Sequence, residues 1–213
     1  MARDGATLAE MAKQAAVMPG FALQAGRGTS PPPAQPNLVR LFSLKHEFSS
    51  EWYKFLNPPD TALSQSMQIG LNVDRFPYQY RGKKITISRV KLFLKFKDIH
   101  DPTTYTHDGT PLGDYAAGTA LVIALTPPTG PVLNNISLAS GAAFLNGLPF
   151  AAVTLPSGSP PGLGNWALTA NNADIAKIPA SFQNIVTSGA STFQHLNAPA
   201  IDDIVLLCHH SAK

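Results

Sequence analysis

The sequence contains a single cysteine, Cys208, among its 213 residues. One thiol can form neither an intramolecular disulfide nor a zinc site built from several cysteines. The chain also lacks an apolar run of about eighteen residues, which a membrane-spanning helix needs, and its start lacks the pattern of a signal peptide. We therefore expect a chain made in the cytoplasm without a signal peptide or membrane span. Release as part of a larger complex stays open.

Charge is also scarce, and it is unevenly distributed. Charged residues make up 14% of the sequence, against roughly 25% in a typical soluble domain. Between Arg75 and Lys97 there are eight basic residues and no acidic residue, whereas the segment from Asp98 to the end carries a net charge of −5. Low charge of this kind is found in assembly components and binding modules, and also in many ordinary domains.

The first 37 residues differ in composition from the rest. Residues 1–23 predict an amphipathic helix, because a capping box at Thr7 precedes apolar residues at helical spacing, until Pro19. Residues 24–37 are rich in proline and glycine and predict an extended linker. The helix would be a docking arm or a tail packed on its own domain, and that domain would span 38–213.

The rest of the chain predicts strands. Residues 66–73 alternate between apolar and polar, and residues 84–97 do so with a one-residue slip at Ser88-Arg89 that indicates a β-bulge. Further strands are predicted at 41–48, 119–125, 150–155, 166–169 and 204–209, and helices at 49–56 and 172–178. Short strands between turns rich in proline and glycine are typical of an antiparallel β-sandwich. We therefore predict an all-β fold with one short internal helix and a separate N-terminal helix.

One face of the strand at 84–97 is basic. The partner-binding residues that we predict lie on this face and just before it: Arg81, Lys83, Lys84, Arg89, Lys91, Phe93, Lys95 and Lys97. Complementary charge would speed the encounter with an acidic protein partner. The same residues could instead form a solvated face or an edge strand that lysines keep from aggregating. Nucleic acid is a weaker interpretation, because no nucleic-acid module is recognisable.

Catalytic and metal-binding patterns are weak. Residues 98–109 contain two histidines and three aspartates, but their spacing matches no EF-hand or zinc-protease motif. His209 and His210 follow Cys208 on a predicted strand, where neighbouring side chains point to opposite faces. The sequence has no nucleophile elbow, P-loop or dinucleotide fingerprint. We predict a protein that is not an enzyme and has no cofactor and no metal site.

Aromatic residues provide an alternative function. β-Sandwiches often present aromatic rings to sugars, and the available rings are Trp52, Tyr53, Tyr78, Tyr80, Tyr105 and Trp166. A carbohydrate-binding domain is therefore the alternative to a protein-docking module. Salt separates the two functions, since docking through lysines and arginines weakens with salt and stacking on rings does not.

Three segments resemble a known family. They read LFSLKHEFSSEWYKFLNP at 41–58, LNVDRFPYQYRGKKITISRVKLFLKFKDI at 71–99 and NAPAIDDIVLLCHHS at 197–211. In this order they are similar to the C-terminal TcB-binding domain of the A component of Tc insecticidal toxin complexes. The resemblance covers less than a third of the chain, and no motif matches in 100–196.

The resemblance implies a β-rich docking platform in a virulence-related toxin complex. In that family, copies of the domain at one end of a pentameric translocation channel receive the β-propeller of the TcB–TcC component. It therefore implies a homo-oligomer with a protein partner. The chain lacks the shell, receptor-binding domains and channel helices of an A component, so we expect an excised domain, a stand-alone relative or a part of another assembly.

The segment at 41–58 predicts architecture rather than an active site. Ser49 or Ser50 can cap a short helix that follows the first strand. The apolar residues of this helix are expected to cover an open end of the sandwich: Trp52, Phe55 and Leu56.

Overall fold

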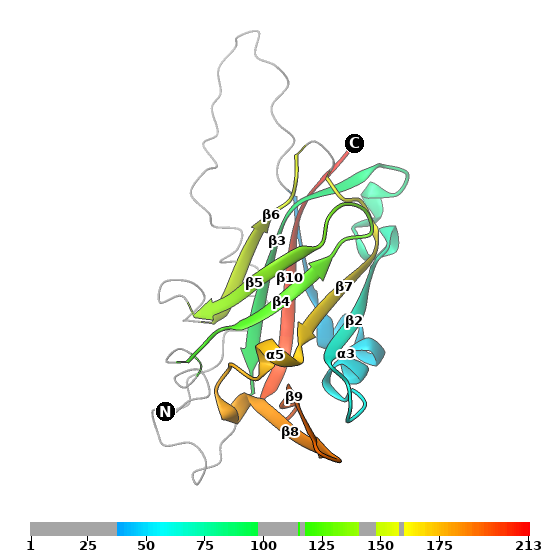
Figure 1. The fold of residues 1–213 in the computed structure, drawn as a ribbon. Helices are drawn as coiled ribbons and strands as arrows, with labels where there is room; N and C mark the ends of the chain where they lie inside the picture. Colours follow the sequence, from blue (N-terminus) through cyan, green and yellow to red (C-terminus); the bar gives the residue numbers. More distant parts are fainter. Residues whose placement is uncertain (1–37, 98–114, 116–117, 141–147, 158–159) are drawn as a thin grey trace, which may run out of the picture.

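The computed structural model describes residues 38–97, 115, 118–140, 148–157 and 160–213 (Figure 1). The predicted helix at 1–23, the linker at 24–37 and the segment 98–109 lie outside these residues. No helix among the described residues is long and apolar enough to cross a membrane.

Strands dominate the described chain. They are β1 (Leu38–Ser43), β2 (Ser64–Leu71), β3 (Ile85–Phe96), β4 (Leu121–Thr126), β5 (Leu133–Ser140), β6 (Pro149–Thr154), β7 (Gly164–Asn171), β8 (Gln183–Ser188), β9 (Ser191–Leu196) and β10 (Ile201–Ala212). The helices are α2 (Leu44–Glu47), α3 (Ser49–Leu56) and α5 (Asn172–Ile175), with short 3₁₀ turns at η1 (Val73–Arg75), η2 (Tyr78–Tyr80) and η4 (Ala180–Phe182).

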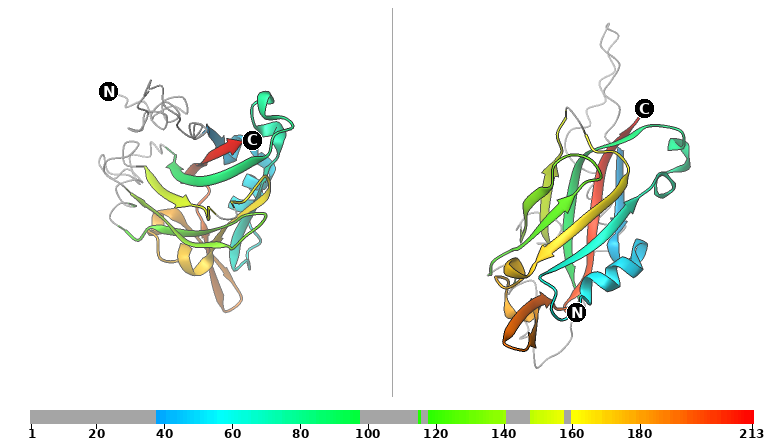
Figure 2. Two further views of the ribbon diagram at one scale, coloured as in Figure 1. Left: turned by 90° about the horizontal axis from the view of Figure 1, so that it is seen from above. Right: turned by 45° about the vertical axis from the view of Figure 1, so that its right-hand side comes forward.

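Eight strands form one antiparallel sheet in the order β1-β10-β3-β6-β5-β4-β7-β2, and β8 pairs with β9 in a separate hairpin. The sheet curls, so that one half, β1-β10-β3-β6, faces the other half, β5-β4-β7-β2 (Figure 2). The fold is therefore all-β and antiparallel, with two facing layers as in a sandwich. The predicted fold class is confirmed.

The two halves share one hydrophobic core. Leu92 and Leu206 from the first half and Trp166 and Leu168 from the second are all 0% exposed and belong to one cluster. Because side chains alternate along a strand, each half turns every second residue into this core. The core therefore determines which strand residues point outward, and these are the candidates for function.

The longest strand pair, β3 with β10, contains the predicted bulge. His209 pairs with Arg89 while His210 pairs with Ile87, so Ser88 is the extra residue on β3. The bulge shifts the alternation of apolar residues along β3 by one position. The apolar residues before it and those after it therefore both face the core. The prediction of a β-bulge in this strand is confirmed.

The predicted strand at 41–48 is wrong beyond Ser43, where β1 ends. The hydroxyl of Ser43 accepts a hydrogen bond from the His46 backbone N–H at 3.2 Å and donates to Oδ2 of Asp203 at 2.6 Å. This capping interaction turns the chain into α2. The predicted capping by Ser49 or Ser50 is also wrong, because Phe48 occupies the N-cap of α3 and makes no side-chain capping bond.

Helix α3 closes the open side of the curled sheet. Trp52, Phe55 and Leu56 are 7%, 0% and 9% exposed, as predicted for a structural plug. The helix lies beside β2, where the side-chain amide of Gln65 donates to the Phe55 carbonyl at 2.6 Å (Figure 1). Since α2 contacts β10 and α3 contacts β2, this segment bridges the two halves.

Several predicted elements differ in extent, and three strands were not predicted. Strand β2 ends at Leu71, so that residue 73 opens a 3₁₀ turn instead of continuing the strand. The predicted helix at 172–178 ends at Ile175. The strands β5, β8 and β9 are additional. The other predicted strands are present with shifted ends.

Candidate functional site

The predicted basic face of β3 is divided by a buried centre. Lys91 and Phe93 are only 5% and 1% exposed, whereas Arg89 and Lys97 are exposed and Lys95 is half-buried. Of the residues predicted to bind a partner, Lys91 and Phe93 are therefore buried in this structure. Over the eight residue steps from Arg89 to Lys97 the extended chain rises roughly 26 Å, so the exposed cations lie at two separate ends.

A second, outer hydrophobic cluster accounts for the burial of Phe93. Phe93 packs with Val205 and Leu207 of β10, and its ring stacks on Phe150 of β6 with 6.0 Å between centroids. Burial lowers the pKa of Lys91, and the charge of Arg89 lowers it further. The alternation of β3 was predicted correctly, but its outer face carries an apolar cluster that the sequence pattern did not reveal.

The first group of exposed cations is called the basic end. It consists of Arg81, Lys83, Lys84 and Arg89, all exposed. A turn through Gly82, with φ of +77°, brings the chain from η2 into β3. The backbone of Lys84 then exchanges two hydrogen bonds with that of Lys213, at 2.8 and 3.0 Å. These bonds tie the basic end to the last residues of β10.

The basic end is only partly neutralised. Arg81 pairs with Asp74 at 3.1 Å and lies over the ring of Tyr78, 4.8 Å from its centroid. In the described part of the chain, Lys83, Lys84 and Arg89 form no ion pair. Three cations are thus available to an acidic surface.

At the other end of β3 the cations surround Asp202. This carboxylate binds Nζ of Lys45 at 2.5 Å and Nζ of Lys95 at 2.8 Å. Burial alone would raise the pKa of Asp202, but the hydrogen bonds and charges of the two lysines outweigh it and hold that pKa below its ordinary value. Next to this group, the side chain of Lys97 donates to the carbonyl of Ala198 at 2.9 Å.

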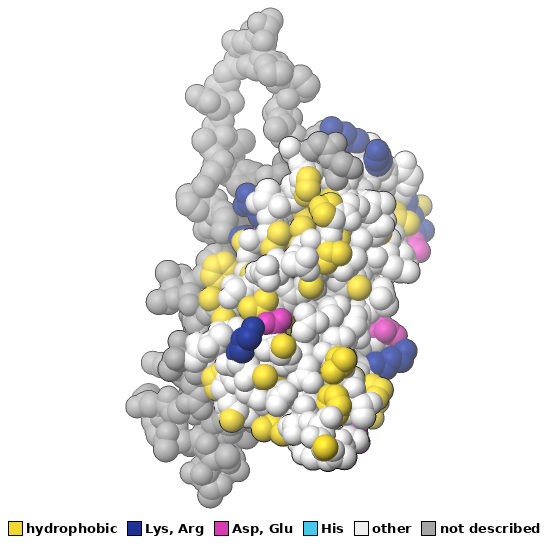
Figure 3. Space-filling model, viewed as in Figure 1, with side chains coloured by type: hydrophobic (Ala, Val, Ile, Leu, Met, Phe, Trp, Pro, Cys, Tyr) yellow, Lys and Arg dark blue, Asp and Glu magenta, His cyan; other side chains and the backbone are white. Residues whose placement is uncertain are grey.

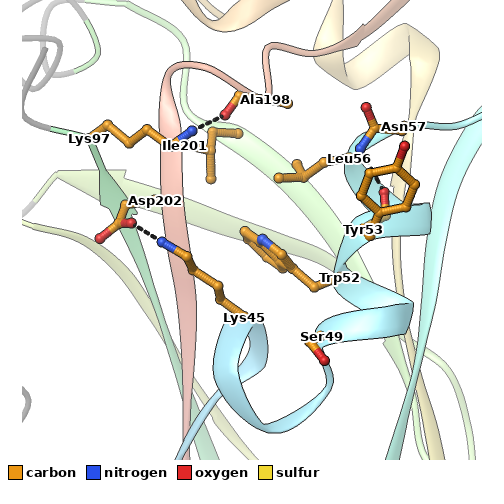
Figure 4. A pocket seen from close by; sticks show the side chains of 10 residues that line it. All are labelled: Lys45, Ser49, Trp52, Tyr53, Leu56, Asn57, Lys97, Ala198, Ile201 and Asp202. Atoms are coloured by element: carbon orange, nitrogen blue, oxygen red, sulfur yellow. Dashed lines mark hydrogen bonds and ion pairs between the residues drawn. The ribbon is translucent and has the colours of Figure 1, made fainter.

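Lys45, Lys97 and Asp202 border a pocket of about 330 Å³, called the Trp52 pocket (Figure 4). Its walls come from α2 and α3 on one side, and from the end of β3 and the start of β10 on the other. Trp52, Leu56 and Ile201 supply apolar surface, while Lys45 and Lys97 supply charge. Sequence reasoning missed this pocket, because residues 45, 97 and 202 are far apart in the chain and no local motif connects them.

The opposite half of the sheet has a surface without charge. None of the strands β2, β7, β4 and β5 contains Asp, Glu, Lys or Arg. Their outward side chains are small and neutral, and form what we call the uncharged face: Ser64, Ser66, Gln68, Asn165, Ala167, Thr169, Asn171, Val122, Ala124, Thr126, Ser137 and Ala139. Figure 3 shows mostly neutral side chains over these strands.

The titratable residues of β10 are built into the fold. Burial raises the pKa of Cys208 to about 12, so the thiol stays protonated at neutral pH. His210 is 2% exposed and lies against the rings of Phe76 and Tyr80, on the core side, whereas His209 is half-buried near Lys91. Within the described ranges, no group of three or more His, Cys, Asp or Glu residues could hold a metal ion.

The aromatic residues predicted for sugar stacking are mostly unavailable. Trp166 is 0% and Trp52 7% exposed, and Tyr80 is half-buried. Tyr53 and Tyr78 are 68% and 77% exposed, and Tyr105 lies outside the described residues. Among the described candidate rings, Tyr53 and Tyr78 are therefore exposed, and Trp52 is accessible only where it lines the pocket.

Comparisons of the chain with protein-family models, with curated proteins and with solved structures gave no match. The resemblance to the TcB-binding domain thus stays a prediction, and function has to be argued from the surfaces of the molecule.

Proposed function

We propose that this chain is a non-enzymatic binding and assembly module, which associates with copies of itself and docks a larger protein partner. The TcB-docking platform of a Tc toxin complex would be an example of such a module. The observation that supports the proposal best is the uncharged face, which extends over four neighbouring strands.

The centres of protein interfaces are depleted of charged residues, whereas the free surfaces of soluble domains usually carry mixed charges. Edge strands in particular use charged side chains to avoid pairing with other chains, and β2, the edge strand of this half, has none. A four-strand surface of Ser, Thr, Asn, Gln, Ala and Val favours contact with another protein. We assign this face to association between copies of the chain.

The basic end supports the docking part of the proposal. Lys83, Lys84 and Arg89 are exposed and lack ion pairs in the described part of the molecule. Uncompensated charge of one sign accelerates encounter with a surface of opposite charge and selects its orientation. The basic end and the uncharged face are contributed by different residues, so substitutions can test each surface separately.

Light scattering of the full chain, at low and at high salt, tests the assembly part. We expect a closed oligomer whose mass is insensitive to salt, because the uncharged face carries the contact. The double variant Ser66→Lys with Gln68→Lys places two charges on exposed positions of this face and should yield monomers. Its control is Thr187→Lys, an exposed position on the β8–β9 hairpin, which should keep the oligomer.

A wild-type monomer under all conditions would contradict assembly through the uncharged face. The carbohydrate-binding alternative would replace the proposal if that monomer also bound an immobilised oligosaccharide and if Tyr53→Ala or Tyr78→Ala abolished this binding. An oligomer that survives the double Lys variant would place self-association elsewhere.

A further inference from the structure

The Trp52 pocket combines an apolar floor with cations at its rim. Trp52, Leu56 and Ile201 are 7%, 9% and 1% exposed, and the indole ring of Trp52 lies between Lys45 and Leu56 in Figure 4. A buried apolar floor with a few polar groups around it is the usual construction of a ligand site. An apolar or aromatic group of modest size fits a volume of about 330 Å³.

The rim favours a ligand that is negatively charged. Its carboxylate, Asp202, already binds Lys45 and Lys95, which leaves little negative charge to attract a cation. Lys97 is exposed, and its described interaction is with a neutral carbonyl oxygen. An ammonium group in this position gains more from a carboxylate than from a carbonyl, because the hydrogen bond is then charge-assisted at both atoms.

The indole of Trp52 supplies a second donor. Its nitrogen makes no hydrogen bond with another described residue. The indole nitrogen of the other tryptophan, Trp166, differs because it is fully enclosed. Although Trp52 is mostly buried, the small part of it that remains accessible lines the pocket, where it can contact an apolar group and donate to an oxygen acceptor. Sequence position does not suggest this role, since Trp52 also belongs to the plug that closes the sheet.

We infer that the Trp52 pocket binds an acidic peptide segment of the docking partner. An aromatic or large aliphatic side chain would lie on Trp52, with a neighbouring carboxylate bound by Lys97. The inference rests on the proposed docking function, because it specifies the chemistry of the partner. It assigns the pocket to the partner, and leaves the uncharged face to copies of the chain.

Nuclear magnetic resonance of the ¹⁵N-labelled full chain tests the inference without the partner. The chain has two tryptophans, so two indole N–H signals are expected, and Trp166 serves as the internal reference. The probes are N-acetyl-phenylalanine, which has a carboxylate, and its neutral amide. We expect the acid to shift the Trp52 signal with a Kd on the order of 1 mM, as is usual for so small a ligand, and the amide to bind about fivefold more weakly.

The variant Lys97→Gln should weaken the binding of the acid about fivefold and leave the binding of the amide unchanged, since the substitution removes the charge and keeps a hydrogen-bond donor. Lys54→Gln is the matched control, because Lys54 is an exposed lysine of α3 that does not line the pocket. It should leave both affinities unchanged.

Three results would overturn the inference: no shift of the Trp52 signal by either probe, equal binding of acid and amide, or a Trp52 shift with methyl glucoside in their place. None of them depends on the oligomeric state. Failure of the pocket is therefore distinguishable from failure of the assembly measured by light scattering, which involves other residues.

Discussion

The two halves of the curled sheet have similar inner faces and different outer faces. Inside, both contribute alternating apolar residues to one core. The charged residues of the described strands are confined to three neighbours, β1, β10 and β3: Arg40, Arg89, Lys91, Lys95, Asp202 and Asp203. The comparison teaches that folding requires the apolar residues of the inner faces, whereas much of the outer faces is free to serve contacts with other molecules.

Part of the charge on the β1-β10-β3 side is structural. Asp203 is 4% exposed and accepts hydrogen bonds from the Ser43 hydroxyl and the Lys45 backbone N–H. Asp202 bridges Lys45 and Lys95. These carboxylates fasten α2 and β3 to the start of β10, so the charged half holds both polar supports and candidate contact residues.

The largest effect is expected at the joint between the halves. Trp52→Ala should lower the free energy of unfolding by about 3 to 5 kcal/mol, because it leaves a large cavity beneath α3. Denaturant titration measures this loss. A change below about 1 kcal/mol would show that the halves hold together without the plug.

A smaller loss is expected within the charged half. Asp203→Ala should cost about 1 to 3 kcal/mol, since it removes a buried acceptor from two donors. The comparison variant on the other half is Ser66→Ala, which removes an exposed hydroxyl contact with Thr169 and should be nearly neutral. Equal losses for the two variants, measured by denaturation, would break the distinction between a structural and a dispensable outer surface.

The charged half should also make stability depend on pH. Burial lowers the pKa of His210, and burial followed by the charges of Lys91 and Arg89 lowers that of His209. The unfolded chain therefore binds protons that the folded chain excludes, so stability is complete above the ordinary histidine pKa of about 6.5 and falls as the pH drops below it.

Denaturation at about pH 7.5 and about pH 5.5 should show this loss, and His210→Leu should reduce it. The exposed His46 provides the control, since His46→Leu should retain the full difference. A difference that His210→Leu leaves unchanged would assign the pH dependence to other groups.

The smallest effect is expected on the uncharged face. Ser66→Lys alone should change the stability of the monomer by less than about 0.5 kcal/mol, because the position is exposed and its backbone pairing with Thr169 is kept. Thermal or chemical denaturation under dissociating conditions measures it. A large loss would mean that the absence of charge is needed for folding, and would remove the main support for an interface.

Much of the fold was predictable from period-two patterns. The alternation of residues 66–73 placed Met67, Ile69 and Leu71 in the core, and the slip at Ser88 located the bulge. The strands β5, β8 and β9 were missed because they are polar, and Asn135 in β5 has φ of +58°, which strand patterns do not anticipate. Their pairing depends on neighbouring strands rather than on their own composition.

The sequence by itself determined the all-β class, the inner faces of the long strands and the plug at Trp52, because side chains alternate along a strand and apolar residues leave water. Only the tertiary structure decided which outward residues remain exposed. Phe93 alternates as an exposed residue would, yet it is buried in the outer cluster with Val205 and Leu207. The Trp52 pocket likewise exists only after β3, β10 and α3 meet, since no local pattern encodes a contact between residues so far apart in the chain.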